Sequence, residues 1–318
     1  MSNKPKITII IPVYNREKLL AFTLESIIEQ TFTDWECILV DDISNDDSFT
    51  VLQEYQKKDS RFKVFHRPKA LRKGANSCRN YGFLQATGSY IKWFDSDDIM
   101  LTKHLEISYK TIVNNKLDFV VTDTLNFNHE NGEILDKPYN FSRKEAIITA
   151  ENFAKNQIGW ITDDFLGKRE FLEKIKFNEN ITADGDEYNF FVRFLHHTVN
   201  GALINEVLTH RRIHNDSLTT INGENTTNFL AKVANVKYQT AQDLVFYNNV
   251  ELIRWFLSGY MQYAFRLANK NESIPFWSPA FKLIYAYYSF IKGCAFIVAV
   301  VTAKYFKMGY NIMKYARK

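Results

Sequence analysis

Cysteine is scarce in this 318-residue sequence, and the spacing of the few cysteines excludes two kinds of small fold. Cys37, Cys78 and Cys294 lie far apart, form no CxxC pair and leave an odd count. A disulfide framework or a zinc site would need paired or closely spaced cysteines. We therefore expect reduced thiols and a cytoplasmic location.

The sequence also lacks internal repeats, low-complexity stretches and a strong excess of charge of one sign. The formal net charge of +4 is too small to indicate nucleic-acid binding. Hydrophobic residues make up 46% and charged residues 24%, a composition typical of a folded globular chain. A chain of this length can form one large domain with a smaller appended part.

The N-terminal apolar run, residues 7–13, does not indicate a signal peptide. It is short and ends in Pro12-Val13-Tyr14-Asn15 without a small-residue cleavage site, so a buried first strand explains it better. Similar short runs recur at residues 35–40, 61–66 and 89–94, separated by segments with helical spacing. This alternation predicts an α/β fold in which helices cover a mostly parallel sheet.

The rest of the chain predicts a few more elements and then an all-helical region. The expected elements are a helix at about 101–115, a strand at 117–122, a helix at 184–197 and a strand at 200–212. From about residue 223 the apolar spacing is mainly helical. We therefore expect one domain over residues 1–220 and a helical region over residues 221–318.

The strongest candidate site is the acidic run Asp95-Ser96-Asp97-Asp98, which follows the predicted strand at 89–94. Clustered carboxylates are hard oxygen ligands that suit Mg²⁺ or Mn²⁺, and these ions commonly also bind substrate phosphates. The alternative is that the run only caps the helix that follows it. Because ligands bind at the carboxyl ends of strands in such sheets, the loops after the other strands are expected to lie beside this run.

Those loops carry further polar candidates. Tyr14 closes the first strand, and Asp41 and Asp42 close the second. An acidic residue at such a strand end can accept hydrogen bonds from a base or a ribose, whereas the acids after it are expected to cap the next helix. Gly74 and Arg79 flank the start of another helix, where backbone N–H groups and a guanidinium could meet a diphosphate.

The C-terminal segment, about 275–318, combines apolar, aromatic and basic residues. Leu283 to Ala303 is almost long enough to cross a bilayer, but Lys292 near its middle would add about 2.5 to 3.5 kcal/mol to the cost of insertion. Lysines alternate with aromatic residues after it. These features predict an interfacial membrane anchor on an anionic leaflet. The alternative is an ordinary helix that packs on the protein or on a second subunit.

Five motifs occur in a fixed order along the chain. They are Pro12-Val13-Tyr14-Asn15, Val40 to Asp46, Gly74 to Gly82, Ala86-Thr87-Gly88 and Asp95-Ser96-Asp97-Asp98. In this order they resemble the signature of family 2 glycosyltransferases over about residues 5–215. The resemblance implies a GT-A fold, with a nucleotide-sugar part at about 1–100 and an acceptor part at about 101–220. It also implies an inverting, Mg²⁺- or Mn²⁺-assisted transfer from a nucleotide sugar, most commonly a UDP-sugar, in bacterial surface-polysaccharide synthesis on a glycan or lipid-linked acceptor.

The same resemblance assigns roles by position. It gives donor binding to Pro12, Tyr14, Asn15, Asp41, Asp42, Gly74, Asn76, Arg79, Asp95 and Ser96. Tyr14 and Asp42 would contact the nucleobase, and Asp41 would support their loop. Asp97 is the expected metal ligand, with Asp98, Asp95 and His214 as further candidates.

The family also has an acidic catalytic base at the start of a later helix. Glu187 lies six residues before Arg193, which is the spacing of that family segment, and Asp186 is the competing choice. The alternative is that both acids only stabilise the helix dipole.

Two later segments complete the resemblance. Trp160, which precedes Thr162-Asp163-Asp164, resembles the acceptor-side segment, and its alternative is a core tryptophan. Arg212 and His214 resemble the late arginine and histidine that approach the diphosphate or the metal, and at strand spacing they share one face.

Other functions stay open at this point. One is a non-catalytic GT-A-like protein that binds nucleotide sugars or glycans, and another is a sugar nucleotidyltransferase. The first strand is not followed by the glycine-rich basic loop that a nucleotidyltransferase needs. It is not followed by GxGxxG either, which argues against a dehydrogenase. No nucleic-acid partner is expected, and an oligomer is compatible with the sequence.

Overall fold

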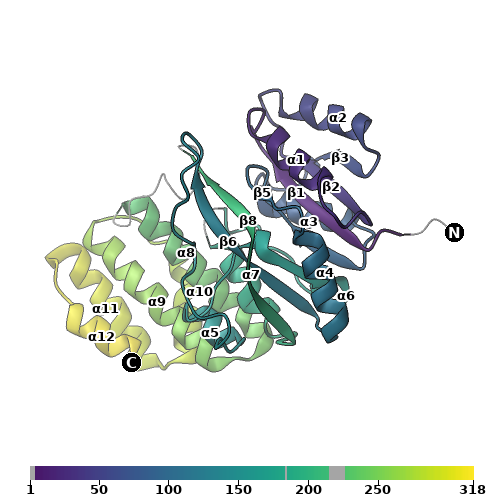
Figure 1. Ribbon diagram of the computed structural model, residues 1–318. Helices are drawn as coiled ribbons and strands as arrows, with labels where there is room; N and C mark the ends of the chain where they lie inside the picture. Colours follow the sequence, from purple (N-terminus) through teal and green to yellow (C-terminus); the bar gives the residue numbers. More distant parts are fainter. Residues whose placement is uncertain (1–3, 183–184, 215–225) are drawn as a thin grey trace. The chain divides into compact units, whose positions relative to one another are not determined.

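The computed structural model describes residues 4–182, 185–214 and 226–318. The chain divides into two compact units. Unit 1 contains Met1–Thr182 and Phe190–His214, and unit 2 contains Ala183–Asn189 and Asn215–Lys318. Figure 1 shows that unit 1 combines a sheet with helices, whereas unit 2 is helical. The short segment 183–189 thus belongs to unit 2, although unit 1 continues on both sides of it in the sequence.

Unit 1 is organised around one sheet. Among the described residues its strands follow the order β3-β2-β1-β4-β7-β6-β8-β5. Their bounds are β1 (Ile7–Val13), β2 (Trp35–Asp41), β3 (Phe62–His66), β4 (Tyr90–Trp93), β5 (Ile99–Met100), β6 (Phe119–Asn128), β7 (Phe165–Lys168) and β8 (Gly201–Ile213).

The directions of the strands confirm the predicted α/β fold with a mostly parallel sheet. β3, β2, β1 and β4 form one parallel part, and β6 and β8 form a second. β7 lies between the two parts and is antiparallel to both β4 and β6, and the short β5 is antiparallel to β8. The structure therefore adds a reversed strand in the middle of the sheet, which the sequence did not predict.

Helices connect the strands of unit 1. They are α1 (Leu20–Ile28), α2 (Ser48–Lys58), α3 (Ala75–Gln85), α4 (His104–Asn115), α5 (Ala150–Ala154) and α6 (Arg169–Leu172), with a 3₁₀ turn η1 (Thr162–Asp164) before β7. α7 (Asp186–Phe194) begins in unit 2 and ends in unit 1. α3 packs very close to β1, because a Cβ at Gly82 would come within 2.5 Å of the Ile10 side chain.

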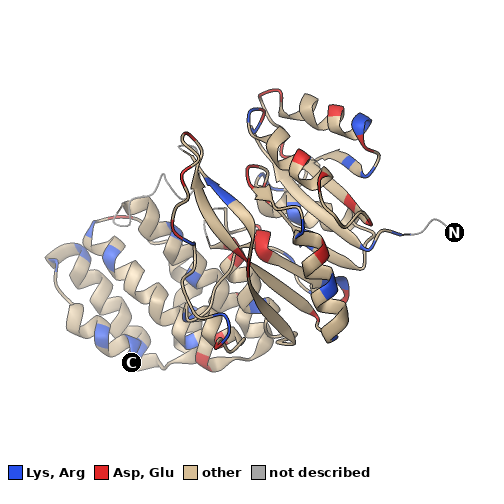
Figure 2. Cartoon of the chain, viewed as in Figure 1, with Lys and Arg blue, Asp and Glu red and all other residues tan. Residues whose placement is uncertain are grey.

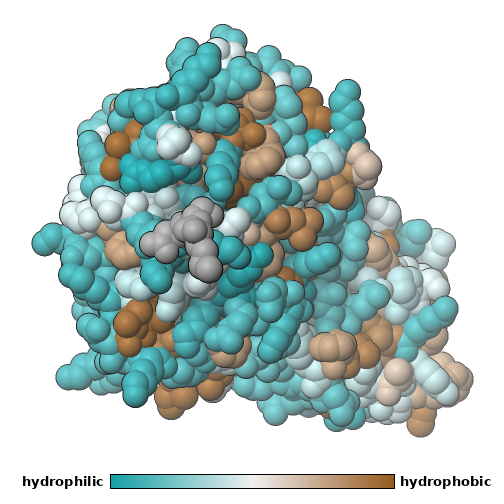
Figure 3. Space-filling view, turned by 90° about the vertical axis from the view of Figure 1, so that its right-hand side faces the viewer, coloured by the Kyte–Doolittle hydropathy of each residue, from teal (hydrophilic) through white to brown (hydrophobic). Residues whose placement is uncertain are grey.

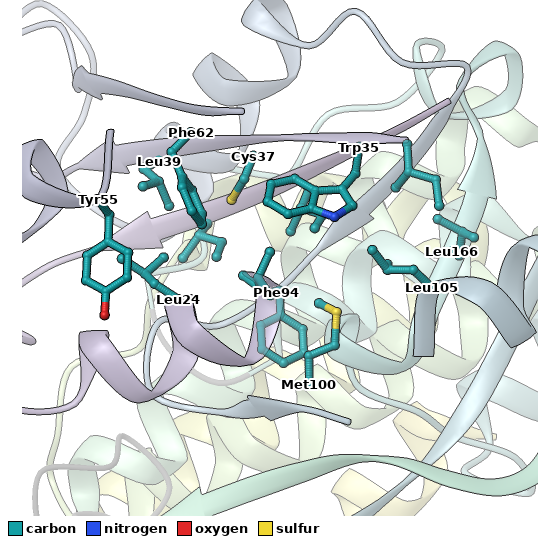
Figure 4. Close-up of a cluster of buried hydrophobic side chains, with 14 of the residues drawn as sticks. Leu24, Trp35, Cys37, Leu39, Tyr55, Phe62, Phe94, Met100, Leu105 and Leu166 are labelled. Atoms are coloured by element: carbon teal, nitrogen blue, oxygen red, sulfur yellow. The ribbon is translucent and has the colours of Figure 1, made fainter. Parts of the chain in front are cut away.

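The main core of unit 1 lies between the sheet and the helices that flank it. Every residue of β1 and β2 is buried, as expected for strands covered on both faces. Figure 4 groups Leu24 of α1 with Leu39 and Phe62 of the sheet, and Phe94, just past β4, joins the same cluster. This packing fixes the strand ends from which the polar loops leave.

Unit 2 consists of helices, which confirms the predicted helical C-terminal region. They are α8 (Thr227–Leu244), α9 (Val250–Asn269), α10 (Trp277–Tyr287), α11 (Phe290–Phe306) and α12 (Tyr310–Arg317), with a 3₁₀ turn η2 (Val245–Tyr247). The predicted domain boundary near residue 220 lies outside the described residues.

The apolar stretch Leu283–Ala303 is divided between two helices, because α10 ends at Tyr287 and α11 begins at Phe290. Within residues 4–182, 185–214 and 226–318, no helix combines the length and the apolar character that crossing a bilayer demands.

Exposed apolar side chains are unevenly distributed along the chain. On the face drawn in Figure 3, hydrophobic residues form separate patches within a mostly hydrophilic surface. The C-terminal helices are rich in large exposed hydrophobic residues, namely Tyr285, Phe290, Ile291, Val298, Val301, Tyr305, Phe306, Tyr310 and Tyr315. These helices therefore carry an apolar surface that their own packing leaves uncovered.

Candidate functional site

The polar loops after β1, β2 and β4 lie along one edge of the sheet of unit 1. Val13 at the end of β1 pairs with Asp41 at the end of β2, and the Phe94 N–H donates to the Ile10 carbonyl at 3.0 Å. The parallel pairing thus brings the ends of these strands together, as expected for the ligand-binding edge of an α/β sheet.

The reversed strand β7 brings one more acid to this edge. Ile91 of β4 lies opposite Gly167 of β7, so the residues that precede β7 lie where β4 ends. The Asp95 N–H accordingly donates to Asp163 Oδ1 at 3.0 Å. The family resemblance grouped Asp163 with Trp160 in the acceptor-side segment, and the sequence did not predict that it lies beside Asp95.

Asp95, Asp98 and Asp163 form a carboxylate cluster in which one ligand atom from each lies within 4.8 Å of the others. Asp98 is 3% exposed and Asp163 is fully buried, whereas Asp95 is partly open. The backbone N–H of Arg212 donates to Asp98 Oδ1 at 2.8 Å, and the buried Oδ2 of Asp163 receives no hydrogen bond from a described donor. An oxygen of this cluster is therefore available to a cation.

The cluster is electrostatically crowded. Burial raises the pKa of Asp98 well above its ordinary value, and the charges of Asp97 and Asp95 raise it further. Burial, together with the charges of Asp95 and Asp98, likewise raises the pKa of Asp163. A bound divalent cation would relieve this repulsion, and hard carboxylate oxygens are the donors that Mg²⁺ and Mn²⁺ prefer. The residues present thus fit the metal that the sequence predicts.

A buried lysine lies beneath the cluster. Lys92, fully buried in β4, donates to the Asp163 carbonyl and lies 2.9 Å from His104 Nε2. Burial lowers the pKa of Lys92 to about 8. Neither residue was singled out from the sequence, although a lysine inside an otherwise apolar and aromatic strand was an available signal.

Asp97, the metal ligand expected from the sequence, has other partners in the structure. Its Oδ2 accepts from Arg16 Nε at 3.0 Å and lies 3.1 Å from His214 Nε2. Burial acts to raise the pKa of Asp97, but the His214 hydrogen bond and the Arg16 charge outweigh it and lower the pKa. Asp97 and His214 are therefore brought together. The compact carboxylate cluster contains Asp163 and not Asp97. Metal ligation by Asp97 or His214 stays a prediction.

Arg212 connects the acidic run to β8. Its Nε donates to the Asp97 carbonyl at 2.8 Å, and its guanidinium lies over the rings of Phe22 and Phe127. Arg212 and His214 thus approach Asp97 from one face of the strand, as their spacing predicts.

Arg79 of α3 supplies a cation next to the cluster. Its Nη2 donates to Asp95 Oδ1 at 2.8 Å, and its side chain is buried. Asn76 donates from Nδ2 to the carbonyls of Asn178 and Ile181, at 3.1 and 2.8 Å. Of these two predicted donor-binding residues, Arg79 lies at the carboxylate cluster. Asn76 instead holds the loop that contains Asn178 and Ile181.

Both acids after β2 are engaged by the protein. Asp41 accepts from the Ser44 hydroxyl at 2.5 Å and from the Ser44 N–H at 3.1 Å. Asp42 accepts from Arg67 Nε and from the Gly74 N–H, the latter at 2.9 Å; Gly74 has φ 137°. These contacts tie Asp41 to its own loop, and the donor-binding roles expected for Asp41 and Asp42 stay predictions.

The loop after β1 joins the loop after β2. Asn15 has φ 51°, a left-handed conformation that asparagine tolerates, and its Oδ1 accepts from the Asn45 N–H at 2.8 Å. Lys73 Nζ lies 3.9 Å from the centroid of the Tyr14 ring. The remaining predicted donor residues, Pro12 and Ser96, are both buried. Contact of Tyr14 with a base, and of Asn15, Pro12 and Ser96 with the donor, stays a prediction.

Trp160 is part of the core. It is fully buried, and its ring lies 4.5 Å from Phe153 and 5.4 Å from Phe191 between centroids. This is the packing role that the sequence left as the alternative. Direct contact with an acceptor would require this aromatic cluster to open.

The two candidate bases lie in unit 2. Asp186 and Glu187 begin α7 just after Gly185, which has φ 102°. The Glu187 N–H donates to Asp186 Oδ1 at 2.9 Å, and both side chains are partly exposed. A partly exposed carboxylate at a helix start can accept a proton, and the structure gives neither acid preference for that role.

Comparisons with known proteins agree with this architecture. The model of the family described as "Glycosyl transferase family 2" matches residues 8–176, more than half of the chain. An uncharacterised glycosyltransferase of Methanocaldococcus jannaschii is 32% identical over 217 residues, which cover 67% of this chain and 72% of that protein. The chain belongs to glycosyl transferase family 2.

Two further comparisons describe its neighbours. A Campylobacter jejuni protein named GalNAc(5)-diNAcBac-PP-undecaprenol beta-1,3-glucosyltransferase is 31% identical over 185 residues, covering 55% of each chain. The structure of S. aureus TarS 1–349 in complex with UDP-GlcNAc matches with a TM-score of 0.67 at 17% identity, covering 98% of this chain and 89% of that one. The fold is of the GT-A type, as the sequence predicts.

The carboxylate cluster predicts how metal affinity responds to substitution. Asp98→Asn and Asp163→Asn should each weaken Mn²⁺ binding by more than about 10-fold, because each removes a ligand charge. Titration with MnCl₂, followed by the electron paramagnetic resonance of the free ion, measures this affinity. Asp136→Asn, an exposed site, is the control. An Asp97→Asn variant that loses as much affinity as Asp163→Asn would instead support the ligand expected from the sequence.

Proposed function

We propose that this protein transfers a sugar from a nucleotide-diphosphate sugar to a hydroxyl group of a glycan or a lipid-linked acceptor, with inversion at the anomeric carbon. The observation that carries the proposal is the crowded carboxylate cluster of Asp95, Asp98 and Asp163 beside the Arg79 guanidinium. Such a site suits a cation-bound diphosphate leaving group. The Arg79 guanidinium would contact the same diphosphate.

The donor would bind along the edge formed by the loops after β1, β2 and β4. Tyr14 and Asp42 would recognise the base, while Asp41 and the Gly74 N–H keep the loop in place through their observed contacts. A divalent cation held by the carboxylate cluster would neutralise the charge that develops on the departing diphosphate. The UDP-GlcNAc complex of TarS supports a UDP-sugar as the first donor to test.

Transfer needs a base for the acceptor hydroxyl. Glu187, or in its place Asp186, would take the hydroxyl proton while the hydroxyl oxygen forms a bond to the anomeric carbon. The bond from that carbon to the diphosphate oxygen would break, and its electron pair would leave with the nucleoside diphosphate. Attack from the face opposite to the leaving group gives inversion in this single displacement.

The acceptor class is supported by the Campylobacter jejuni relative, whose name describes transfer to an undecaprenol-linked glycan. A lipid-linked acceptor would require the enzyme to work at a membrane, and surface-polysaccharide synthesis is the corresponding process. The second candidate, a binding protein without turnover, is weakened by the acids at the start of α7, Asp186 and Glu187, which are suited to proton transfer.

The C-terminal helices supply a surface for such contact. No Asp or Glu occurs from Ser273 to Lys318, whereas this stretch carries the basic residues Lys282, Lys292, Lys304, Lys307, Lys314, Arg317 and Lys318. Lys282 lies on α10, Lys292 and Lys304 lie on α11, and Lys314 and Arg317 lie on α12. In Figure 2, α11 and α12 carry blue segments and no red ones. With the exposed aromatic residues of the same helices, this composition suits the inner, anionic leaflet of the cell membrane.

A donor screen tests the proposal. Mn²⁺-dependent release of nucleoside diphosphate should occur with one or a few nucleotide sugars, among which UDP-sugars are tested before dTDP- and GDP-sugars. The same donors should raise the melting temperature, because they bind the folded state. Absence of both hydrolysis and stabilisation across the panel would contradict a nucleotide-sugar donor.

Replacement of the base separates chemistry from binding. Glu187→Gln should lower kcat by about 10²- to 10⁴-fold and leave the donor Kd within about twofold, since a general base acts in the chemical step. Asp186→Asn is the matched control on the same turn. If Asp186→Asn alone loses turnover, the base is Asp186; normal turnover in both variants would reject this segment as its source.

Membrane contact predicts a dependence on basic charge. Replacing Lys304, Lys314 and Lys318 by Gln should weaken binding to phosphatidylserine-containing vesicles on the order of 100-fold, at about 1 kcal/mol for each lysine. Vesicle flotation measures the effect. Replacing the exposed Lys57, Lys103 and Lys144 of unit 1 by Gln is the control. Equal partitioning of both triple variants would favour a protein-packing role for this surface.

A further inference from the structure

The first turn of α7, which carries the two candidate bases, is held by α8 at both of its ends. A Cβ at Gly185 would lie 2.8 Å from the Val236 side chain, so the turn begins in close contact with α8. At its other end the buried Asn189 donates from Nδ2 to Thr240 Oγ1 at 3.1 Å and to Asp243 Oδ2 at 3.0 Å. These contacts explain why segment 183–189 belongs to unit 2.

Between these two contacts, Lys237 of α8 reaches residues of α7 and α9. Its Nζ lies 5.1 Å from the ring centroid of Tyr188, 4.1 Å from that of Trp255 and 4.9 Å from that of Phe256. The Tyr188 hydroxyl is 3.4 Å from the same nitrogen. The hydrocarbon stem packs on α9, where a Cβ at Gly259 would meet its Cδ at 3.2 Å. An ammonium among aromatic faces is attracted by their quadrupoles, so Lys237 joins α7 to α9.

Two effects act on the charge of this lysine in opposite directions. Burial lowers its pKa to about 8, well below the ordinary lysine value, whereas the three aromatic rings attract the ammonium. The protonated form therefore carries a desolvation cost. An uncharged side chain of similar length would fill the same space without that cost. Its charge therefore needs an explanation other than packing.

We propose that Lys237 is a positioning residue, which acts through the Tyr188 ring to hold the first turn of α7 in the orientation that directs its acid. Tyr188 directly follows Glu187, so a displacement of Tyr188 would shift the backbone of the turn that carries Glu187. This inference rests on the proposed function, which gives Glu187 or Asp186 the role of base. A small misplacement of a catalytic group is enough to slow a reaction strongly.

The test compares three variants of the full-length chain. Lys237→Met keeps the stem and removes the charge, Lys237→Arg keeps a cation over the rings, and Lys232→Met removes a different lysine of α8 as the control. Lys237→Met should lower kcat by about 10- to 100-fold with an unchanged donor KM. Its melting temperature should stay close to that of the wild type, because the substitution removes the desolvation cost together with the attraction of the rings. Lys237→Arg should recover most of kcat, and Lys232→Met should change neither quantity.

The pH profile gives a further readout. Within the part of the chain that the structure describes, the Tyr188 hydroxyl contacts Lys237 from α7, and the contacts from α9 come from Trp255, Phe256 and Gly259, which do not titrate. Wild-type kcat should fall as the pH rises above about 8, where the lysine loses its proton. The Lys237→Arg enzyme should keep its rate to higher pH.

Amide hydrogen exchange decides the inference independently of turnover. In Lys237→Met the peptide covering residues 185–192 should exchange about 10-fold faster than in the wild type, whereas Lys232→Met should leave it unchanged. Unchanged exchange and unchanged kcat in Lys237→Met would overturn the positioning role. A wild-type chain that transfers no sugar would instead reject the proposed function, and the exchange experiment would still decide whether Lys237 holds the turn.

Discussion

Repulsion between the buried carboxylates Asp98 and Asp163 is the electrostatic constraint on which unit 1 depends. Burial alone disfavours both charges, and their proximity to Asp95 adds to the cost. The surrounding structure offsets part of it through the Lys92 ammonium, bonded to the Asp163 carbonyl, and through the Arg212 N–H, bonded to Asp98. The remaining repulsion is what a bound divalent cation would relieve, and under the proposed function that cation would carry the diphosphate. The fold thus places acids where burial alone would not favour them.

The neighbouring contacts keep this arrangement rigid before any ligand arrives. Arg16 and His214 approach Asp97 from two distant parts of the sequence, and Arg79 reaches Asp95 from α3. Each is a charge-assisted contact with little room for rearrangement, because most of the side chains involved are buried or half-buried. In preorganised sites of this kind, little reorganisation is needed when charge develops on the reacting groups.

The parts of the structure with a local signal could be predicted from the sequence. Strands β1 and β2 are continuous apolar runs, because both of their faces are covered, and the acidic run at Asp95 to Asp98 follows a buried strand directly. The role of Asp163 could not be predicted, since it depends on the direction of β7, and a four-residue strand carries no sign of its direction. The burial of Trp160 was open for a similar reason: a tryptophan in a loop-like segment has the same sequence whether it packs in a core or faces a ligand.

The reversed strand β7 also limits how this architecture can be recombined. Asp95 and Asp98 belong to the first hundred residues of the chain, whereas Asp163 enters the cluster from a segment that joins the two parallel parts of the sheet. The first hundred residues therefore do not form the complete carboxylate cluster by themselves. Consider a chimera whose second half comes from a relative. That half would have to carry an equivalent acid just before its strand corresponding to β7. Without it, the chimera would keep the fold and lose one of the three carboxylates of the cluster.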